Sequence, residues 1–250
     1  MKAILTAALM TATALPALAF DPANMTEAEK TAFGAAVRDY LMANPEVLVE
    51  SINVLEARRA ADEASNDKLL VANNKDAIFE DGYSWVGGNP DGDVTMVEFI
   101  DYRCGYCKQI NPAVEKLLKD DGNIRWIIKE FPILSQESDM AARFAIAVQQ
   151  EAGADAYKQA HDALLMASRG PVNLESLGAL AGKLGLDGKA VMNRMNTEAV
   201  STVIRSNQQL AERMRIMGTP TFIIEGEMLR GVPTDGLEPI IAAARAAKKG

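Results

Sequence analysis

The cysteine content of this chain constrains it more than any other feature: Cys104 and Cys107 are its only two cysteines, and two residues separate them. Residues 94–100, just before the pair, form a β-branched and aromatic run that predicts a buried strand. Residues 108–118, just after it, carry apolar side chains at helical spacing. The pair is therefore predicted to lie where a strand passes into a helix, and all thiol chemistry of the chain is confined to that place.

This position predicts that Cys104 is reactive. At a helix N-terminus, unpaired backbone N–H groups and the positive end of the macrodipole favour a negative charge. We therefore expect the pKa of the Cys104 thiol to fall from about 8.5 into the range of roughly 3.5 to 7 found in C-x-x-C motifs. A thiolate of this kind is both a nucleophile and a good leaving group. Cys107, one turn further along, is expected to be shielded and to act as the resolving thiol.

A metal site is the alternative use of two cysteines at this spacing. Structural zinc needs four Cys or His ligands, and the chain has a single histidine, His161, in a separate region of helical pattern. Redox chemistry is favoured, and neither a metal nor a cofactor is expected. A pair of thiolates can still hold soft Cu(I), alone or across subunits. His161 itself is expected to be a surface or helix-packing residue.

Residues 1–19 have the pattern of a secretory signal peptide. Lys2 supplies the positive charge, residues 3–15 the short apolar stretch, and residues 17–19 an A-x-A cleavage site. The mature chain is expected to begin at Phe20 and to be periplasmic, with an uncleaved anchor as the alternative. Disulfides persist outside the cytosol, so an exported dithiol has protein substrates to act on.

Charge limits the class of partner. Without Lys2 the chain has 25 basic and 34 acidic residues, a net charge of −9. This balance argues against a nucleic acid held through its phosphates. Hydrophobic residues make up 48% of the sequence, which is enough for a sizeable core in one domain with appendages.

Residues 20–78 are predicted to form an N-terminal helical arm. A capping box is indicated at Thr26 to Glu29, and Asn44-Pro45 interrupts the pattern before a second helix. Such an arm cannot bury its apolar side alone, so it either folds back or pairs with copies of itself. Its place outside the catalytic unit favours a homo-oligomer, a dimer or trimer, without a firm coiled-coil heptad. The apolar positions are Phe33, Val37, Tyr40, Leu41, Leu48, Ile52 and Leu55.

Residues 79–250 are predicted to form an α/β domain whose sheet is split by a block of helices at about 138–217. A turn cluster at residues 87–92 marks entry into this domain. The remaining strands are expected at residues 124–131, 221–224 and 227–230, and a closing helix at 236–247.

Two motifs carry a family resemblance. The segment from Glu98 to Lys108, with the dithiol, and the segment from Met217 to Phe222 together resemble the DsbA-like branch of the thioredoxin superfamily, the exported bacterial thiol-disulfide oxidoreductases. The resemblance covers about residues 83–247. It implies a thioredoxin fold with an inserted helical domain, which agrees with the 113 residues that separate Cys107 from Pro220.

The resemblance also assigns roles to individual residues. Thr219-Pro220 resembles the family's cis-proline loop, which lies beside the cysteines and offers backbone groups to an extended substrate peptide. Glu98 matches the buried acid of thioredoxin-like proteins; its pKa is expected to be raised, and it can accept the proton of Cys107. The residues between the cysteines, Gly105 and Tyr106, are expected to contact substrate and to tune the redox potential.

The direction of redox flow is harder to predict. Gly105-Tyr106 and the threonine before the proline are similar to the disulfide isomerase DsbC, whereas DsbA has Pro-His between its cysteines. Without that histidine the thiolate loses a positive partner, which predicts a weaker oxidant. Residues 39–48 resemble the N-terminal segment of ScsC-type proteins, in which such arms join subunits. Isomerase or reductase activity on exported cysteine-containing proteins is slightly favoured over oxidase activity, with a membrane protein as redox partner. A copper-binding or copper-stress protein is the alternative.

Overall fold

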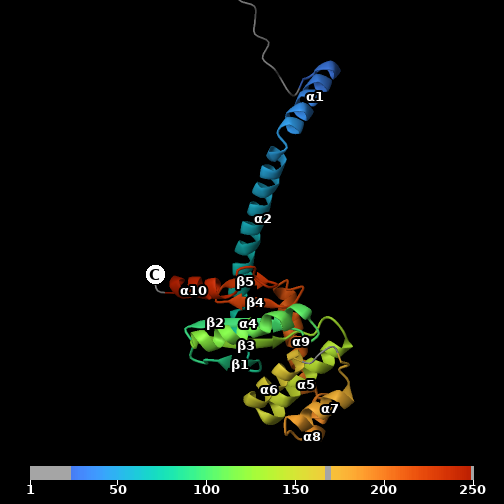
Figure 1. Cartoon of the computed structure of the whole chain (residues 1–250), viewed down its shortest axis with the longest axis vertical. Helices are drawn as coiled ribbons and strands as arrows, with labels where there is room; N and C mark the ends of the chain where they lie inside the picture. The colour runs from blue at the N-terminus through green and yellow to red at the C-terminus, as the bar shows by residue number, and fades with distance from the viewer. Residues whose placement is uncertain (1–23, 167–169, 249–250) are drawn as a thin grey trace, which may run out of the picture. The chain divides into compact units, whose positions relative to one another are not determined.

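The computed structural model describes residues 24–166 and 170–248 (Figure 1). The predicted signal peptide and the predicted mature N-terminus at Phe20 lie outside these ranges. The chain divides into two compact units at Arg59 and Ala60. No helix within the described ranges is long and apolar enough to span a membrane.

The first unit is helical. Helix α1 (Glu27–Ala43) begins at the predicted capping box, in which the Thr26 hydroxyl accepts from the Glu29 amide and the Glu29 carboxylate accepts from the Thr26 amide. Helix α2 (Glu46–Asn73) follows and runs across the division between the units. Helix α1 has no buried residue. Leu41 and Val47 are half-buried, and most of the other large apolar side chains of this unit are exposed: Phe33, Val37, Tyr40, Met42, Leu48, Val49, Ile52, Val54 and Leu55.

The second unit is built on a five-stranded sheet with the order β1-β3-β2-β4-β5. The central strands β2 (Val94–Ile100) and β3 (Ile124–Glu130) are parallel. They need a crossover, which helix α4 (Gly105–Asp121) provides. The remaining strands are antiparallel to their neighbours: β1 (Trp85–Gly88), β4 (Thr221–Ile224) and β5 (Glu227–Arg230).

A block of helices separates β3 from β4, as the sequence predicts, and the described residues of this segment form five of them. They are α5 (Gln136–Ala152), α6 (Ala154–Met166), α7 (Leu174–Lys183), α8 (Gly188–Arg194) and α9 (Glu198–Arg213). Figure 1 shows α5 to α8 grouped beyond the β1 side of the sheet. The fold is a mixed α/β sheet with this helical insertion, closed by α10 (Glu238–Ala247).

Each central strand is buried on both faces because helices cover both. Met96, Ile100 and Trp126 belong to the larger core, which includes the cysteines and the helical insertion. Val97 and Phe99, which alternate with them, pack in a second core with Ile78 of α3 (Lys75–Phe79), Val71 of α2 and Leu210 of α9. Residues 60–79 thus pack within the second unit.

The turn cluster predicted at residues 87–92 is only partly a turn. Gly87 and Gly88 are paired with β3 as the end of β1. The Trp85 ring folds over Gly87, where a Cβ atom would lie 1.8 Å from the ring, and Gly88 has φ +67 with the Ile124 carbonyl 2.4 Å from an ideal Cβ. Glycine is therefore required for packing and backbone conformation, and the true turn begins at Asn89.

Helix α9 ends at Arg213, four residues before the predicted end at Met217. Arg215 has φ 54, a left-handed conformation that turns the chain, and the Ile216 amide donates to the Ala211 carbonyl. This early end frees residues 217–220 to cross to the cysteines.

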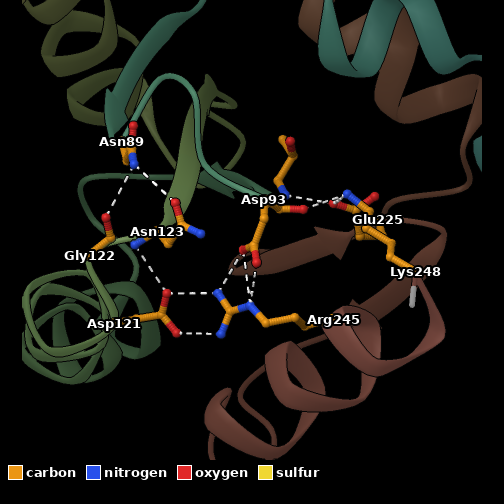
Figure 2. A network of polar contacts seen from close by, with 9 residues as sticks. Asn89, Asp93, Asp121, Gly122, Asn123, Glu225, Arg245 and Lys248 are labelled. Atoms are coloured by element: carbon orange, nitrogen blue, oxygen red, sulfur yellow. Dashed lines mark hydrogen bonds and ion pairs between the residues drawn. The ribbon is translucent and has the colours of Figure 1, made fainter. Parts of the chain in front are cut away.

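Charged groups join the C-terminal helix to the N-terminal end of strand β2, which is the end away from the cysteines (Figure 2). The Arg245 guanidinium lies between two carboxylates, with its Nε 2.8 Å from an Asp93 oxygen and its Nη1 2.9 Å from an Asp121 oxygen. The Lys248 ammonium reaches the Asp93 carbonyl and the Glu225 carboxylate. Hydrogen bonds from Arg245 hold the pKa of both aspartates below their ordinary value.

Candidate active site

Cys104 is the N-cap of α4, at the strand-to-helix junction that the sequence predicts. Its sulfur accepts a hydrogen bond from the Cys107 amide, with a donor–acceptor distance of 3.4 Å. The two cysteines are free thiols, and Cys104 is 5% and Cys107 1% exposed. The first turn of the helix thus places its orphan N–H groups at the Cys104 sulfur.

The surroundings of the two sulfurs shift the pKa values of the two thiols in opposite directions. Hydrogen bonds lower the pKa of Cys104 to about 5, although burial opposes this shift; their donors are the Cys107 thiol, the Thr219 side chain and the amides of Cys107 and Tyr106. The same thiol–thiol bond, together with burial, raises the pKa of Cys107 well above its ordinary value. One sulfur is therefore a thiolate at neutral pH and the other a thiol.

The loop at residues 217–220 meets the cysteines. The Thr219–Pro220 peptide bond is cis, as predicted. In the thiol form, the Cys104 sulfur donates to the Thr219 carbonyl at 3.2 Å. The Thr219 hydroxyl is buried and has no hydrogen-bond partner among the described residues while Cys104 is a thiol; it can donate to the sulfur when Cys104 is a thiolate, which lowers the pKa of Cys104. Met217, just before this loop, is 87% exposed.

Glu98 lies on β2, buried to 3% exposure, and accepts a hydrogen bond from the Trp126 indole N–H at 3.1 Å. Burial raises the pKa of Glu98 to about 8; the Trp126 bond opposes the shift, and the charges of Glu115 and Cys104 add to it. Its charge in turn raises the pKa of Cys107. A carboxyl with this pKa, coupled to both sulfurs, can exchange a proton at neutral pH.

The residues between the cysteines face outward. Tyr106 is 67% exposed, and a Cβ atom added to Gly105 would meet nothing within 4 Å. Both lie on the first turn of α4, beside the nucleophilic sulfur. Both are therefore placed to contact a substrate that reaches Cys104 from this turn.

A buried polar cluster under the site was not predicted. Glu130, at the end of β3, accepts hydrogen bonds from the hydroxyls of Tyr102 at 2.7 Å and Tyr157 at 2.6 Å. Burial raises the pKa of Glu130 to about 8, against these two bonds. The available signal was the adjacent charged pair Lys129-Glu130 at the end of a strand predicted to be central.

His161 belongs to this cluster and is a packing residue of α6, which is one of the two expected positions, and it does not lie at the surface. It is fully buried on α6, where its ring packs against Tyr102, Trp126 and Tyr157. Its Nδ1 lies 3.2 Å from the Tyr102 hydroxyl. Because that hydroxyl donates to Glu130, His161 must donate from Nδ1. Burial lowers the pKa of His161 to about 3, so the ring is neutral.

Within the described ranges, no group of three or more His, Cys, Asp or Glu side chains is arranged to hold a metal ion. The chemistry that the arrangement supports is exchange at sulfur: a thiolate at the start of a helix, a thiol beside it, and a buried acid coupled to both. Such a site performs thiol–disulfide exchange.

Comparison with known families agrees with this chemistry. The family model described as a DsbA-like thioredoxin domain matches residues 95–238, more than half of the chain. The chain therefore belongs to the DsbA-like thioredoxin family and is a thiol-disulfide oxidoreductase by family. A second model, described as the N-terminal domain of the copper resistance protein ScsC, matches residues 29–62.

Solved structures give the same picture. A thioredoxin-like oxidoreductase from Silicibacter pomeroyi is 35% identical, with a TM-score of 0.64 over 71% of this chain and 99% of that one. ScsC of Proteus mirabilis in a transitional conformation is 28% identical, with a TM-score of 0.64 over 91% of this chain and 100% of that one. A periplasmic thioredoxin-like protein of Salmonella enterica serovar Typhimurium is 31% identical, with a TM-score of 0.59 over 69% and 95% of the two chains.

Among curated proteins, this chain is similar to one part of a larger protein. The Na⁺/H⁺ antiporter NhaA 1 of Salinispora arenicola is 31% identical over 165 residues, which are 66% of this chain and 25% of the antiporter. The chain thus spans about a quarter of that relative's length.

Proposed function

We propose that this chain is an exported, periplasmic protein thiol-disulfide oxidoreductase whose net activity is reshuffling or reduction more than oxidation. The observation that carries the proposal is the pair of opposed thiol acidities, with the pKa of Cys104 lowered to about 5 and that of Cys107 raised. The pair has Gly-Tyr, and no histidine, between the cysteines. The thiolate therefore lacks one positive partner, which places the pair nearer to an isomerase than to a strong oxidant.

The proposed catalytic cycle starts with the Cys104 thiolate. It attacks one sulfur of a substrate disulfide, and the other substrate sulfur leaves as a thiolate while a mixed disulfide forms. In reshuffling, a substrate thiolate then attacks the mixed disulfide and Cys104 leaves unchanged. In reduction, Cys107 transfers its proton to the Glu98 carboxylate and attacks the Cys104 sulfur, so that the substrate is released with two thiols and the enzyme is left oxidised. Oxidation is the reverse of this sequence.

The roles of the surrounding residues follow from their positions. The Thr219 carbonyl, which precedes the cis bond to Pro220, lies beside Cys104, where an extended substrate segment can bind. Tyr106 and Gly105 lie on the turn beside the sulfur and contact the substrate. The clients are exported proteins with cysteines, and a membrane protein restores the redox state of the pair.

We further propose that residues 1–19 are a cleaved signal, residues 20–78 the arm, and residues 79–250 the catalytic domain, with the last part of the arm, residues 60–78, packed within the same unit as the catalytic domain. The exposed apolar side chains of α1 and of the first half of α2 support assembly of the arms into a dimer or trimer. Several sites facing one substrate benefit an isomerase.

Two measurements on the mature chain test this function. The reduction potential of the pair, obtained by equilibration with glutathione, is expected at about −180 mV or lower, whereas a value near about −120 mV would mean a strong oxidant. Turnover of a scrambled disulfide substrate without metal is expected, and Cys104→Ser should abolish it. No turnover by the wild-type chain would reject the proposal.

Copper handling is the second candidate function, favoured by the match of residues 29–62 to the ScsC N-terminal domain. The two sulfurs would then serve as Cu(I) ligands. Competition with a Cu(I) chelator separates the two functions: tight Cu(I) binding by a chain that turns over no disulfide would favour this candidate.

A further inference from the structure

One buried carboxylate near the cysteines has no part in the cycle above. Asp101 follows β2 directly, three residues before Cys104, and is 1% exposed. Its Oδ1 accepts from the Arg103 amide at 2.7 Å. Its Oδ2 accepts from the amides of Ile133 at 2.9 Å and Leu134 at 3.1 Å. The carboxylate thus joins the cysteine loop to the segment that follows β3.

The backbone of the same residue touches both cysteines. The Asp101 carbonyl accepts from the Cys104 amide at 3.0 Å. The Asp101 amide forms a hydrogen bond with the Cys107 sulfur, which lowers the pKa of Cys107 against the larger opposing effects. A shift of Asp101 would therefore move the start of α4, on which the Cys104 sulfur depends for its donors.

Aspartate is the residue that satisfies all three amides. Asparagine has one oxygen and one NH₂ group in the same place. If its oxygen faced Ile133 and Leu134, its NH₂ would face the Arg103 amide, and the reverse orientation would leave the other two amides without an acceptor. Either way a donor meets a donor in a buried site, at a cost of about 1–3 kcal/mol for each unsatisfied group.

We propose that Asp101 is a positioning residue of this enzyme: its carboxylate clamps the cysteine loop to residues 133–134 and thereby holds the first turn of α4 in the geometry that keeps Cys104 nucleophilic. The proposal rests on the proposed function of the dithiol but concerns a property of Cys104 that is measured without turnover.

The test compares Asp101→Asn with a matched control. Asp81→Asn is suited because the Asp81 side chain is 7% exposed and also accepts two backbone amides, those of Tyr83 and Ser84, but pairs with Lys129. Alkylation of Cys104 in the reduced chain, followed by mass across a pH series, gives its titration midpoint. In Asp101→Asn we expect the midpoint to rise by about one unit, with alkylation at pH 5 slowed about fivefold. Asp81→Asn should lose stability and keep the wild-type midpoint.

Two outcomes overturn the proposal: a folded Asp101→Asn chain with the wild-type midpoint, or the same shift in both variants. If Asp101→Asn does not fold, amide hydrogen exchange in the wild-type chain decides. Ile133 and Leu134 are 40% and 55% exposed, so slow exchange of their amides would support the clamp, and exchange at the unprotected rate would overturn it. Scrambled-substrate turnover by the wild type reports separately on the proposed function.

Discussion

Replacing Glu98 by glutamine should make the protein more stable and a poorer catalyst. The pKa of Glu98 is about 8 in the folded chain against an ordinary 4.5, so the folded state holds this proton more tightly than the unfolded state. A raised carboxyl pKa contributes stability that is fully present below pH 4.5 and is lost as the pH rises through 8. Linkage gives a penalty of about 3 kcal/mol at pH 7, which glutamine does not incur.

The dependence on pH is the sharpest readout. Urea unfolding of reduced wild type and Glu98→Gln, followed by circular dichroism, should give a stability difference that widens by about 2.5 kcal/mol between pH 5 and pH 7. An unpaired NH₂ group on the glutamine shifts the whole curve by a constant and leaves this slope unchanged. Parallel curves would refute the argument from burial.

Glu130→Gln provides a matched control, because the pKa of Glu130 is also raised to about 8 by burial. It should show the same widening of stability with pH. Only Glu98→Gln should slow the attack of Cys107 on a preformed mixed disulfide, by about a hundredfold if proton transfer to the carboxylate is lost. Equal rates of resolution in the two variants would remove Glu98 from the cycle.

Other residues and segments give further predictions. The pKa of His161 is about 3 in the fold against an ordinary 6.5, so its contribution to stability is present above pH 6.5 and lost as the pH falls toward 3; His161→Gln should flatten this acid loss in urea titrations. Arg245→Met should lower the melting temperature, and the decrease should be smaller in 1 M salt. It should leave the titration midpoint of Cys104 unchanged, because the two carboxylates that pair with Arg245 lie at the N-terminal end of β2, away from the cysteines. Deleting residues 20–59 should reduce the mass of the assembly and its scrambled-substrate activity while the second unit stays folded by circular dichroism. Deleting residues 20–75 should also destabilise that unit, because Val71 and its neighbours pack within it.

Local pattern predicted much of this fold. The strands at residues 94–100, 221–224 and 227–230 are confirmed to the residue, because turns bound each of them and the first two are rich in β-branched residues. The glycines at the end of β1 misled the prediction, since a glycine required by a neighbouring tryptophan ring has the same local pattern as one required by a turn. The early end of α9 could also not be predicted from the sequence, because the helical spacing of apolar residues continues past Arg213.

The candidate site likewise has features that the local sequence pattern predicts and features that it does not. The direction of the Cys104 and Glu98 shifts followed from a helix start and a buried strand, both of which are local. The clustering of Tyr102, Glu130 and His161 was not accessible, because it joins residues up to 59 positions apart and depends on how α6 packs over β3. Sequence spacing indicates which face of an element is apolar but not which polar groups meet beneath it.

The long insertion between β3 and β4 is what allows these distant groups to meet. The Thr219 carbonyl that contacts Cys104 lies 115 residues further along the chain, beyond all five insertion helices. One of those helices, α6, carries Tyr157 to Glu130 and His161 to Tyr102, which lies two residues before the nucleophile. The insertion therefore contacts the segment before Cys104 through α6, and its last helix, α9, leads into the loop of residues 217–220 that contacts Cys104. Changes in its packing should alter the reactivity of Cys104 even when they lie outside the surface that a substrate touches.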